Sequence, residues 1–390
     1  MRGRILNRLA SNVALSLTVI AALLIATEII VRFVYHPENL GTVIQFDAKL
    51  GWLLKPGSYL HSVDRGRGLD YRIRINSLGL RERSISMQKP AGKKRVLILG
   101  DSIAFGTGVE IGERFSDLLG NHLGEGIEVV NGSICGWGND QELLFYETFA
   151  RRLNPDIVVL TLTLNNDILN NMLDHLYLET APKPRFLLRS DSLILDEGHL
   201  VPPKLPLSLK IRRLFRKSRF LVYIKRRLDM RRYQQITDAL THIPTRGFEK
   251  KRLEEDCSYW SVYRKGYGQR FEQGWNVTEA ILSRFISRCN EHGTKPIIFA
   301  FPLKIEVDDT WRSQLFDRAN VDSMLFDFRK PYDRLSSFCA AKQTVFVYPL
   351  EDFREASRRV PLYFERDSHP NRNGHAQAAA ALHAVLEDRL

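Results

Sequence analysis

The amino-acid sequence predicts an α/β protein, a three-layer α/β/α sandwich around a mostly parallel five-stranded sheet. Two observations support this prediction. Five short apolar runs, rich in β-branched residues, occur along the chain, and helical patterns lie between them. Parallel strands that are covered by helices on both faces have continuous apolar runs rather than alternating ones. The runs cover residues 96–99, 126–131, 156–162, 296–301 and 344–348.

The composition is that of a folded globular protein. The chain has 390 residues, of which 44% are hydrophobic and 26% are charged. This length suits one large domain or two modest ones, with a core that needs no disulfide or metal for stability. The four cysteines form no C-x-x-C pattern, which indicates neither a zinc site nor a thioredoxin-like motif: Cys135, Cys257, Cys289 and Cys339. Their spacing leaves open one disulfide among the last three.

The excess positive charge is concentrated in one segment. The formal net charge is +12, and residues 204–232 carry twelve Lys or Arg and one acid, a net +11. The remainder is nearly neutral, unlike a nucleic-acid-binding surface. Apolar residues recur at helical spacing within this segment, including Ile211, Leu214 and Phe215. Such a helix can lie on an anionic membrane or cover a groove for an anionic polymer, or it can be a solvated helix packed on the domain.

The N-terminal sequence predicts a transmembrane helix. Residues 12–34 read NVALSLTVIAALLIATEIIVRFV, and a helix of this length spans about 33 Å, enough for the hydrocarbon core of a bilayer. A carboxylate such as Glu28 costs about 2.5–3.5 kcal/mol in this setting, and Arg32, one turn further on, can pair with it. A cleaved signal peptide is the alternative, but no small-x-small cleavage site follows the apolar run.

Basic residues on one side of this helix predict its orientation. Arg2, Arg4 and Arg8 precede the span, whereas the residues after it are of mixed charge. Because cytoplasmic flanks are enriched in Lys and Arg, we expect a cytoplasmic N-terminus and a main domain on the outer side of the membrane.

The order of segments predicts three parts. Residues 1–36 form a cytoplasmic stub and the transmembrane anchor. Residues 37–90 form a small β-rich collar, in which the sequence DYRIRI has the alternation of a half-buried strand. Residues 91–390 form the main domain, and the strand–helix rhythm is interrupted there by a basic insertion at about 183–257.

Polar segments follow the predicted strands at the edge where a doubly wound sheet collects its reactive groups. Gly-Asp-Ser at 100–102 follows the first strand, NGSICGWGND at 131–140 the second, and LNND at 164–167 the third, while RDSHPNRNGH at 366–375 precedes the last helix. Taken singly, each segment has a structural explanation as a helix cap or a turn. The four together, each at a strand end, indicate an active site.

These segments resemble the conserved blocks of the SGNH (GDSL-type) hydrolases, and the anchor and collar resemble those of membrane-anchored bacterial members. Ser102 matches the nucleophile block, and Gly136 matches the glycine block. Asn166 matches the asparagine block, while Asp367 and His369 match the acid–histidine block. The resemblance implies the SGNH, flavodoxin-like form of the α/β sandwich.

The resemblance covers roughly residues 94–178 and 295–390, in the family's block order. The usual acid of the family stands three residues before the histidine, where this chain has Arg366, and the aspartate is two residues before it. We expect Asp101 to be structural and Cys135 to be a small buried hydrophobic residue.

The resemblance implies a Ser–His–Asp mechanism of acyl transfer. Ser102 would be the nucleophile, His369 the base that takes its proton, and Asp367 the carboxylate that orients the ring. The backbone N–H groups of Ser102 and Gly136, with the side-chain amide of Asn166, would form the oxyanion hole.

We therefore expect an SGNH-type serine esterase or O-acyltransferase, anchored in a bacterial inner membrane with a periplasmic catalytic domain. Its expected substrates are acyl esters, above all acetyl esters, of a cell-envelope glycan or glycolipid. Nothing in the sequence implies a metal, an organic cofactor or a nucleic-acid partner. One alternative is a non-catalytic envelope protein that keeps this fold to bind polysaccharide or a biosynthetic partner. The other is a lipase or thioesterase.

Overall fold

The chain folds into two compact units in the computed structural model, which describes residues 2–34, 43–176, 181–190, 192–198, 200–201, 218, 220–221, 223–224 and 258–390. Unit 1 comprises residues 1–40 and 203–241, and unit 2 comprises residues 41–202 and 242–390. The four polar segments that we identified as a candidate active site, at 100–102, 131–140, 164–167 and 366–375 (the candidate segments), all belong to unit 2.

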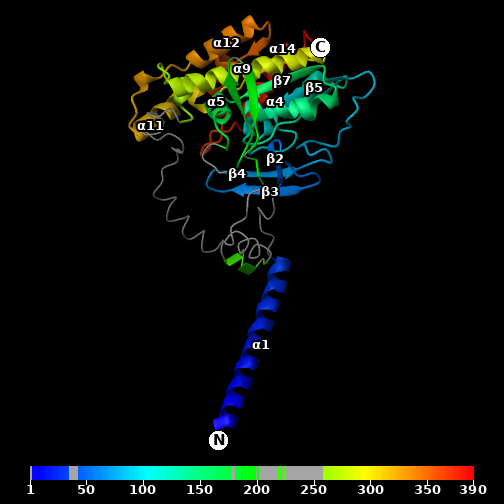
Figure 1. Ribbon diagram of the computed structural model, residues 1–390, viewed down its shortest axis with the longest axis vertical. Helices are drawn as coiled ribbons and strands as arrows, with labels where there is room; N and C mark the ends of the chain where they lie inside the picture. Colours follow the sequence, from blue (N-terminus) through cyan, green and yellow to red (C-terminus); the bar gives the residue numbers. More distant parts are fainter. Residues whose placement is uncertain are drawn as a thin grey trace. The chain divides into compact units, whose positions relative to one another are not determined.

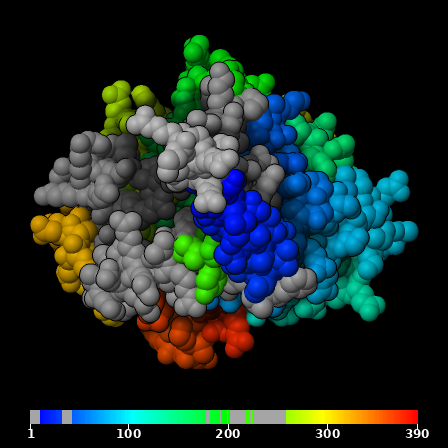
Figure 2. Space-filling model, turned by 90° about the horizontal axis from the view of Figure 1, so that it is seen from below, coloured from blue at the N-terminus to red at the C-terminus, as the bar shows by residue number. Residues whose placement is uncertain are grey.

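Helix α1 (Arg2–Val34) belongs to unit 1 and is drawn in blue in Figures 1 and 2. Its apolar part, 22 residues with a mean hydropathy of 2.4, is long and apolar enough to cross a membrane. The expected ion pair is present, with Arg32 Nε 2.9 Å from Glu28 Oε1. Ser218 Oγ and the Phe220 N–H donate to the second oxygen of Glu28, at 2.7 and 3.0 Å. Both oxygens of this carboxylate therefore have hydrogen-bond partners.

Unit 2 is built on a five-stranded sheet in which every pairing is parallel, and this confirms the predicted fold class. Its strands are β5 (Lys94–Leu99), β6 (Ile127–Asn131), β7 (Ile157–Leu162), β10 (Lys295–Ala300) and β11 (Val345–Val347). Their order in space is β11-β10-β7-β5-β6 (Figure 1). Every residue of β7 is buried. This is expected because β7 is a central strand, covered on both faces, and its sequence is almost entirely apolar.

Helices cover both faces of this sheet. They are α2 (Ser102–Phe105), α3 (Phe115–Leu123), α4 (Asn139–Thr148), α5 (Leu164–Met172), α9 (Gln269–Glu291), α10 (Lys304–Val307), α11 (Asp309–Ala319), α12 (Lys330–Ala341), α13 (Leu350–Ser357) and α14 (Arg372–Leu386), with 3-10 turns at Ala150–Leu153, Ser261–Tyr263 and Ser323–Leu325. Helix α3 packs against α14, whereas α4 and α5 pack against α9. The chain leaves β5 for β6 in one direction along the sheet and continues to β7 in the other. Because connections between parallel strands are right-handed as a rule, such a reversal places the connecting helices on opposite faces of the sheet.

Two antiparallel strand pairs make up the collar, and they lie in the same compact unit as the sheet. They are β1 (Ile44–Asp47) with β2 (Gly51–Leu54), and β3 (Tyr59–Asp64) with β4 (Leu69–Arg74). Burial alternates along β4, as its sequence predicts. The buried Arg81 ties the collar to the chain just beyond Ser102, since its guanidinium donates to the carbonyls of Phe105 and Gly106 at 2.9 and 2.7 Å.

The described part of the expected insertion begins with the antiparallel pair β8 (Arg185–Arg189) and β9 (Ser192–Asp196). Most of the basic segment at 204–232, including Ile211, Leu214 and Phe215, lies outside the described residues. Cys257 lies outside them too, and the other three cysteines, Cys135, Cys289 and Cys339, are free thiols.

Candidate active site

The Gly-Asp-Ser segment forms the turn between β5 and α2. A Cβ atom at Gly100 would lie only 2.7 Å from the Cβ of Ala104, so the turn accommodates no side chain there. Asp101 is the N-cap of α2, and its Oδ1 accepts the Ile103 N–H at 2.9 Å. Ser102 is the first residue of this helix, so its backbone N–H has no acceptor within the helix.

His369 reaches this serine from the loop before α14. Its Nε2 lies 2.9 Å from the Oγ of Ser102, and its Nδ1 lies 2.5 Å from Oδ1 of Asp367. The same carboxylate oxygen accepts the backbone N–H of His369 at 2.8 Å. Asn371 caps α14, and its side-chain amide also donates to the Pro361 carbonyl at 2.9 Å, which holds the loop in place. The structure thus brings the predicted serine, histidine and aspartate together.

The carboxylate selects the tautomer of the ring. An ionised carboxylate can only accept, so Nδ1 of His369 carries the proton, and Nε2 is left to accept the hydroxyl hydrogen of Ser102. Burial by itself would raise the pKa of Asp367, but the hydrogen bond and charge of His369, together with Arg67, hold it well below its usual range. The carboxylate therefore remains charged at neutral pH and can stabilise an imidazolium.

Arg67 is a member of this cluster that sequence reasoning missed. It lies in the turn between β3 and β4, and its Nε forms an ion pair with Oδ2 of Asp367. Its Nη2 lies 3.3 Å from Nδ1 of His369. The local sequence RGRG at 65–68 indicates a turn, but no pattern in it points to a partner 300 positions away.

Asp101 holds the amide of Asn166 beside the serine. The Nδ2 of Asn166 donates to Oδ2 of Asp101 at 2.8 Å, and Thr163 Oγ1 donates to the other oxygen at 2.9 Å. The Ser102 hydroxyl lies 3.5 Å from the oxygen that binds Asn166. Because a primary amide has two hydrogens, one can remain on Asp101 while the other meets a ligand. Asp101 thus has the structural role that we expected.

Gly136, the remaining predicted oxyanion residue, lies in a confined part of the chain. Its φ of +79° favours glycine, and a Cβ there would lie 3.2 Å from both terminal methyl groups of Leu176 and 3.5 Å from the Trp52 ring. The Trp52 indole N–H donates to the Cys135 carbonyl at 3.1 Å and so fixes the peptide that precedes this glycine.

Two other side chains of reactive type near the cluster, Cys135 and His375, are not suited to catalysis. Burial raises the pKa of the Cys135 thiol to about 11, so it is protonated at neutral pH. Burial also lowers the pKa of His375 to about 3, and the Nδ1 of this neutral ring accepts the Phe115 N–H at 3.2 Å. Neither side chain is therefore a candidate for catalysis, and Cys135, which we expected to be buried, is only partly so. Among the described residues, no group of three or more His, Cys, Asp or Glu could hold a metal ion.

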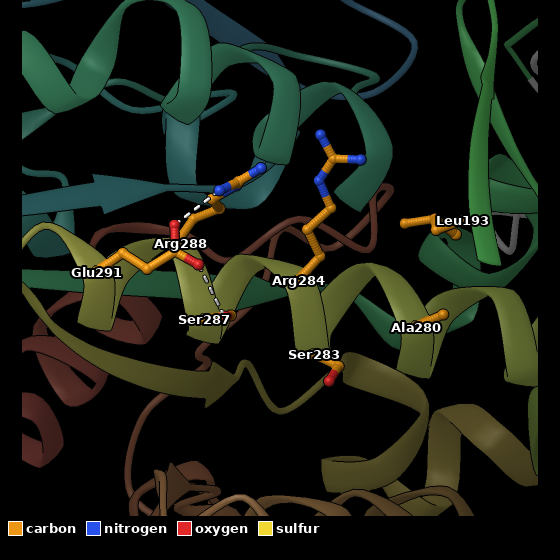
Figure 3. Close-up of a pocket in the computed structure, with 7 residues that line it drawn as sticks. All are labelled: Leu193, Ala280, Ser283, Arg284, Ser287, Arg288 and Glu291. Atoms are coloured by element: carbon orange, nitrogen blue, oxygen red, sulfur yellow. Dashed lines mark hydrogen bonds and ion pairs between the residues drawn. The ribbon is translucent and has the colours of Figure 1, made fainter. Parts of the chain in front are cut away.

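A groove of about 420 Å³ lies along α9 beside Leu193 of β9 (Figure 3). Its two arginines already bind an acid, since Arg284 Nε and Arg288 Nε lie 2.9 and 3.0 Å from Glu147 Oε1. None of the residues that line the groove belongs to the four candidate segments.

Comparisons with known proteins found similar chains among the solved structures. No protein-family model and no curated protein matches the chain. Among the solved structures that match is a GDSL-like lipase from Bacteroides thetaiotaomicron, which is 12% identical, with 78% of this chain and 93% of that one covered and a TM-score of 0.37. An acetylxylan esterase from Geobacillus stearothermophilus is 14% identical, with 76% and 94% covered and a TM-score of 0.37. A G-D-S-L-family lipolytic protein from Veillonella parvula is 13% identical, with 76% and 100% covered and a TM-score of 0.38.

Proposed function

We propose that this chain is an SGNH-type serine esterase or O-acyltransferase. Ser102 is the nucleophile, His369 the general base and acid, and Asp367 the residue that orients the ring. The observation that carries the proposal is the continuous hydrogen-bond path from Asp367 Oδ1 through His369 to Ser102 Oγ, with separations of 2.5 and 2.9 Å. A serine hydroxyl is a weak nucleophile until such a base removes its proton.

The first half-reaction forms an acyl-enzyme. Ser102 Oγ bonds to the carbonyl carbon of the ester while its proton moves to His369 Nε2. The carbonyl oxygen becomes an oxyanion, which the N–H groups of Ser102 and Gly136 and the Asn166 amide would stabilise. The bond from the carbonyl carbon to the alcohol oxygen then breaks, and His369 returns the proton to the departing alcohol.

The second half-reaction repeats these steps with a new nucleophile. Water or an acceptor hydroxyl gives its proton to His369 as its oxygen attacks the acyl-enzyme, and the proton returns to Ser102 when the serine leaves. Water gives hydrolysis and a sugar hydroxyl gives transfer, so the same residues serve both reactions.

We propose a short acyl group, above all acetyl, as the part of the substrate that meets the serine. The methyl groups of Leu176 and the ring of Trp52 lie close to Gly136, one of the proposed oxyanion residues. We propose that these two side chains border the acyl group, which would favour acetyl over fatty acyl chains.

We propose that α1 anchors the enzyme in a bacterial inner membrane with a periplasmic catalytic domain, where the acyl groups belong to an envelope glycan or glycolipid. The length of the apolar part of the helix supports the anchor. The arginines before it support the orientation. An alkaline phosphatase reporter fused after residue 40 should then be active, because this reporter works only outside the cytoplasm. An inactive reporter in a stably expressed fusion would contradict the orientation.

The central experiment compares the wild-type protein with Ser102→Ala. We expect the wild type to react with a fluorescent fluorophosphonate and to hydrolyse p-nitrophenyl acetate, and the variant to do neither. Ser337→Ala, at an exposed serine of α12, is the matched control and should behave as the wild type. A folded wild-type protein that neither labels nor turns over would refute the proposal and favour the non-catalytic alternative.

A further inference from the structure

Arg67 contacts both members of the acid–histidine pair, although it belongs to the collar. Its Nε pairs with Asp367 Oδ2, and its Nη2 lies 3.3 Å from His369 Nδ1. We propose, on the basis of the proposed function, that Arg67 is a positioning residue that fixes the triad carboxylate and sets the acid limit of activity.

The two oxygens of Asp367 have separate tasks. Oδ1 accepts both the ring N–H and the backbone N–H of His369, at 2.5 and 2.8 Å, whereas Oδ2 faces Arg67. A carboxylate held by one oxygen can still rotate about the bond to its Cβ. With both oxygens bound, its plane is fixed, and so is the direction in which it presents Oδ1 to the ring. A buried carboxylate also needs such partners, and the Asp367 side chain is only 6% exposed.

The arginine is itself held in position by its turn. Asp64 Oδ1 accepts the backbone N–H groups of Gly66 and Arg67, both at 3.1 Å. Next to this turn, Gly108 is packed between the collar and the catalytic loop, since a Cβ added there would lie 2.5 Å from the ring of Phe364 and 3.0 Å from Leu69. The guanidinium therefore approaches Asp367 from a braced hairpin rather than from a loose surface loop.

Arg67 also acts on the charge of the ring. A permanent cation beside Nδ1 opposes protonation of His369, and by pairing with Asp367 it weakens the pull of that carboxylate on an imidazolium. Removing the cation should therefore favour the protonated ring, which cannot serve as a base. The other titratable or charged groups around this cluster are Asp367 itself, Ser102 with Asp101 behind it, Asp64 and Tyr71 near the arginine, Lys304 near the carboxylate with Glu365 beside that lysine, and His375 of α14. These groups all remain in an Arg67 variant, so a shift in the acid limit of activity can be assigned to the loss of the arginine.

The experiment compares Arg67→Gln and Arg67→Lys with the wild type, and Arg65→Gln from the same turn is the control. With p-nitrophenyl acetate we expect Arg67→Gln to lower kcat by about 10- to 100-fold with little change in KM, as is typical when a group that orients a functional side chain is lost. The pH at which activity falls to half on the acid side should rise by about one unit. Arg67→Lys keeps a cation and should leave this acid limit close to that of the wild type. Arg65→Gln should match the wild type in both measurements.

A second readout does not depend on turnover. In protein labelled with ¹⁵N-histidine, and with the resonances assigned through His369→Ala, the pH-dependent shift of the His369 ring should lie at higher pH in Arg67→Gln. The proposal is wrong if Arg67→Gln matches the wild type, or if it loses activity without moving either pH profile. A wild-type protein without esterase activity would refute the proposed function, and the ring titration would still decide the role of Arg67.

Discussion

The Nε2 of His369 lies 2.9 Å from the Oγ of Ser102, across 267 positions of sequence. The serine stands at the carboxyl end of β5, and the histidine comes from the loop before the last helix. A parallel sheet brings such residues together because the carboxyl ends of its strands share one edge. This arrangement gives the serine hydroxyl a base within hydrogen-bonding distance.

Asp367→Asn should lower kcat on p-nitrophenyl acetate by about 10⁴-fold, because an amide in place of the carboxylate presents the wrong hydrogen-bonding group to the ring and favours the wrong tautomer. KM should change little, since the ring is not required for ground-state binding. Asp333→Asn, at an exposed position of α12, is the control. A folded Asp367→Asn protein with activity near that of the wild type would exclude this aspartate from the triad.

Asn166→Ala should lower kcat by about 10²–10³-fold, the usual loss when one oxyanion donor is removed. The reason is that its amide, held by Asp101 at 2.8 Å, would otherwise meet the negative charge of the tetrahedral intermediate. Steady-state kinetics with Asn165→Ala as the control measure this effect. If Asn166→Ala raised KM and left kcat unchanged, the amide would serve substrate binding rather than the transition state.

Leu176→Ala should widen the range of acyl groups that the enzyme accepts. A Cβ at Gly136 would lie 3.2 Å from the leucine methyl groups. If these methyl groups border the acyl group, as we propose, their removal makes room for further methylene groups, each worth about 10-fold or more. We expect the ratio of rates on p-nitrophenyl butyrate and acetate to rise by about 10-fold. Leu173→Ala, from the same segment, serves for comparison, and an equal ratio in both variants would argue against control of acyl length by Leu176.

Glu142→Gln should make stability less dependent on pH. Burial raises the pKa of Glu142 to about 8, against the hydrogen bond from Asn139, which lowers it. The folded protein therefore holds this proton more tightly than the unfolded chain does. The contribution of this proton to the free energy of unfolding is fully present below about pH 4.5, and it is lost as the pH rises toward about 8.

Thermal unfolding at several pH values tests this linkage. Between about pH 6 and 9 the wild-type Tm should fall by about 3 °C more than that of Glu142→Gln. The pKa of Asp167 is also raised, by burial and by the charges of Glu142 and Asp101, so some pH dependence should remain in the variant. Parallel Tm curves for the two proteins would show that Glu142 does not contribute to the linkage.

The strands were predictable because their signal is local. Each buried parallel strand has an apolar run in the sequence, and the predicted runs at 96–99, 126–131 and 156–162 agree with β5, β6 and β7 to within about two residues at each end. The turn at Gly100 was predictable for the same reason, since the residues that shape it are neighbours in the chain. The basic segment, by contrast, remains a prediction, because most of it lies outside the described residues.

The sequence by itself determined the fold class and the residue types available at the sheet edge, because apolar periodicity and turn chemistry act over a few residues. Only the tertiary structure decided that Arg67 faces Asp367, that Asp101 holds Asn166, and that the collar shares a compact unit with the sheet. These contacts join segments that are far apart in the chain. Their geometry follows from how the hairpin, helices and sheet bury their apolar faces against one another, and no local pattern records it.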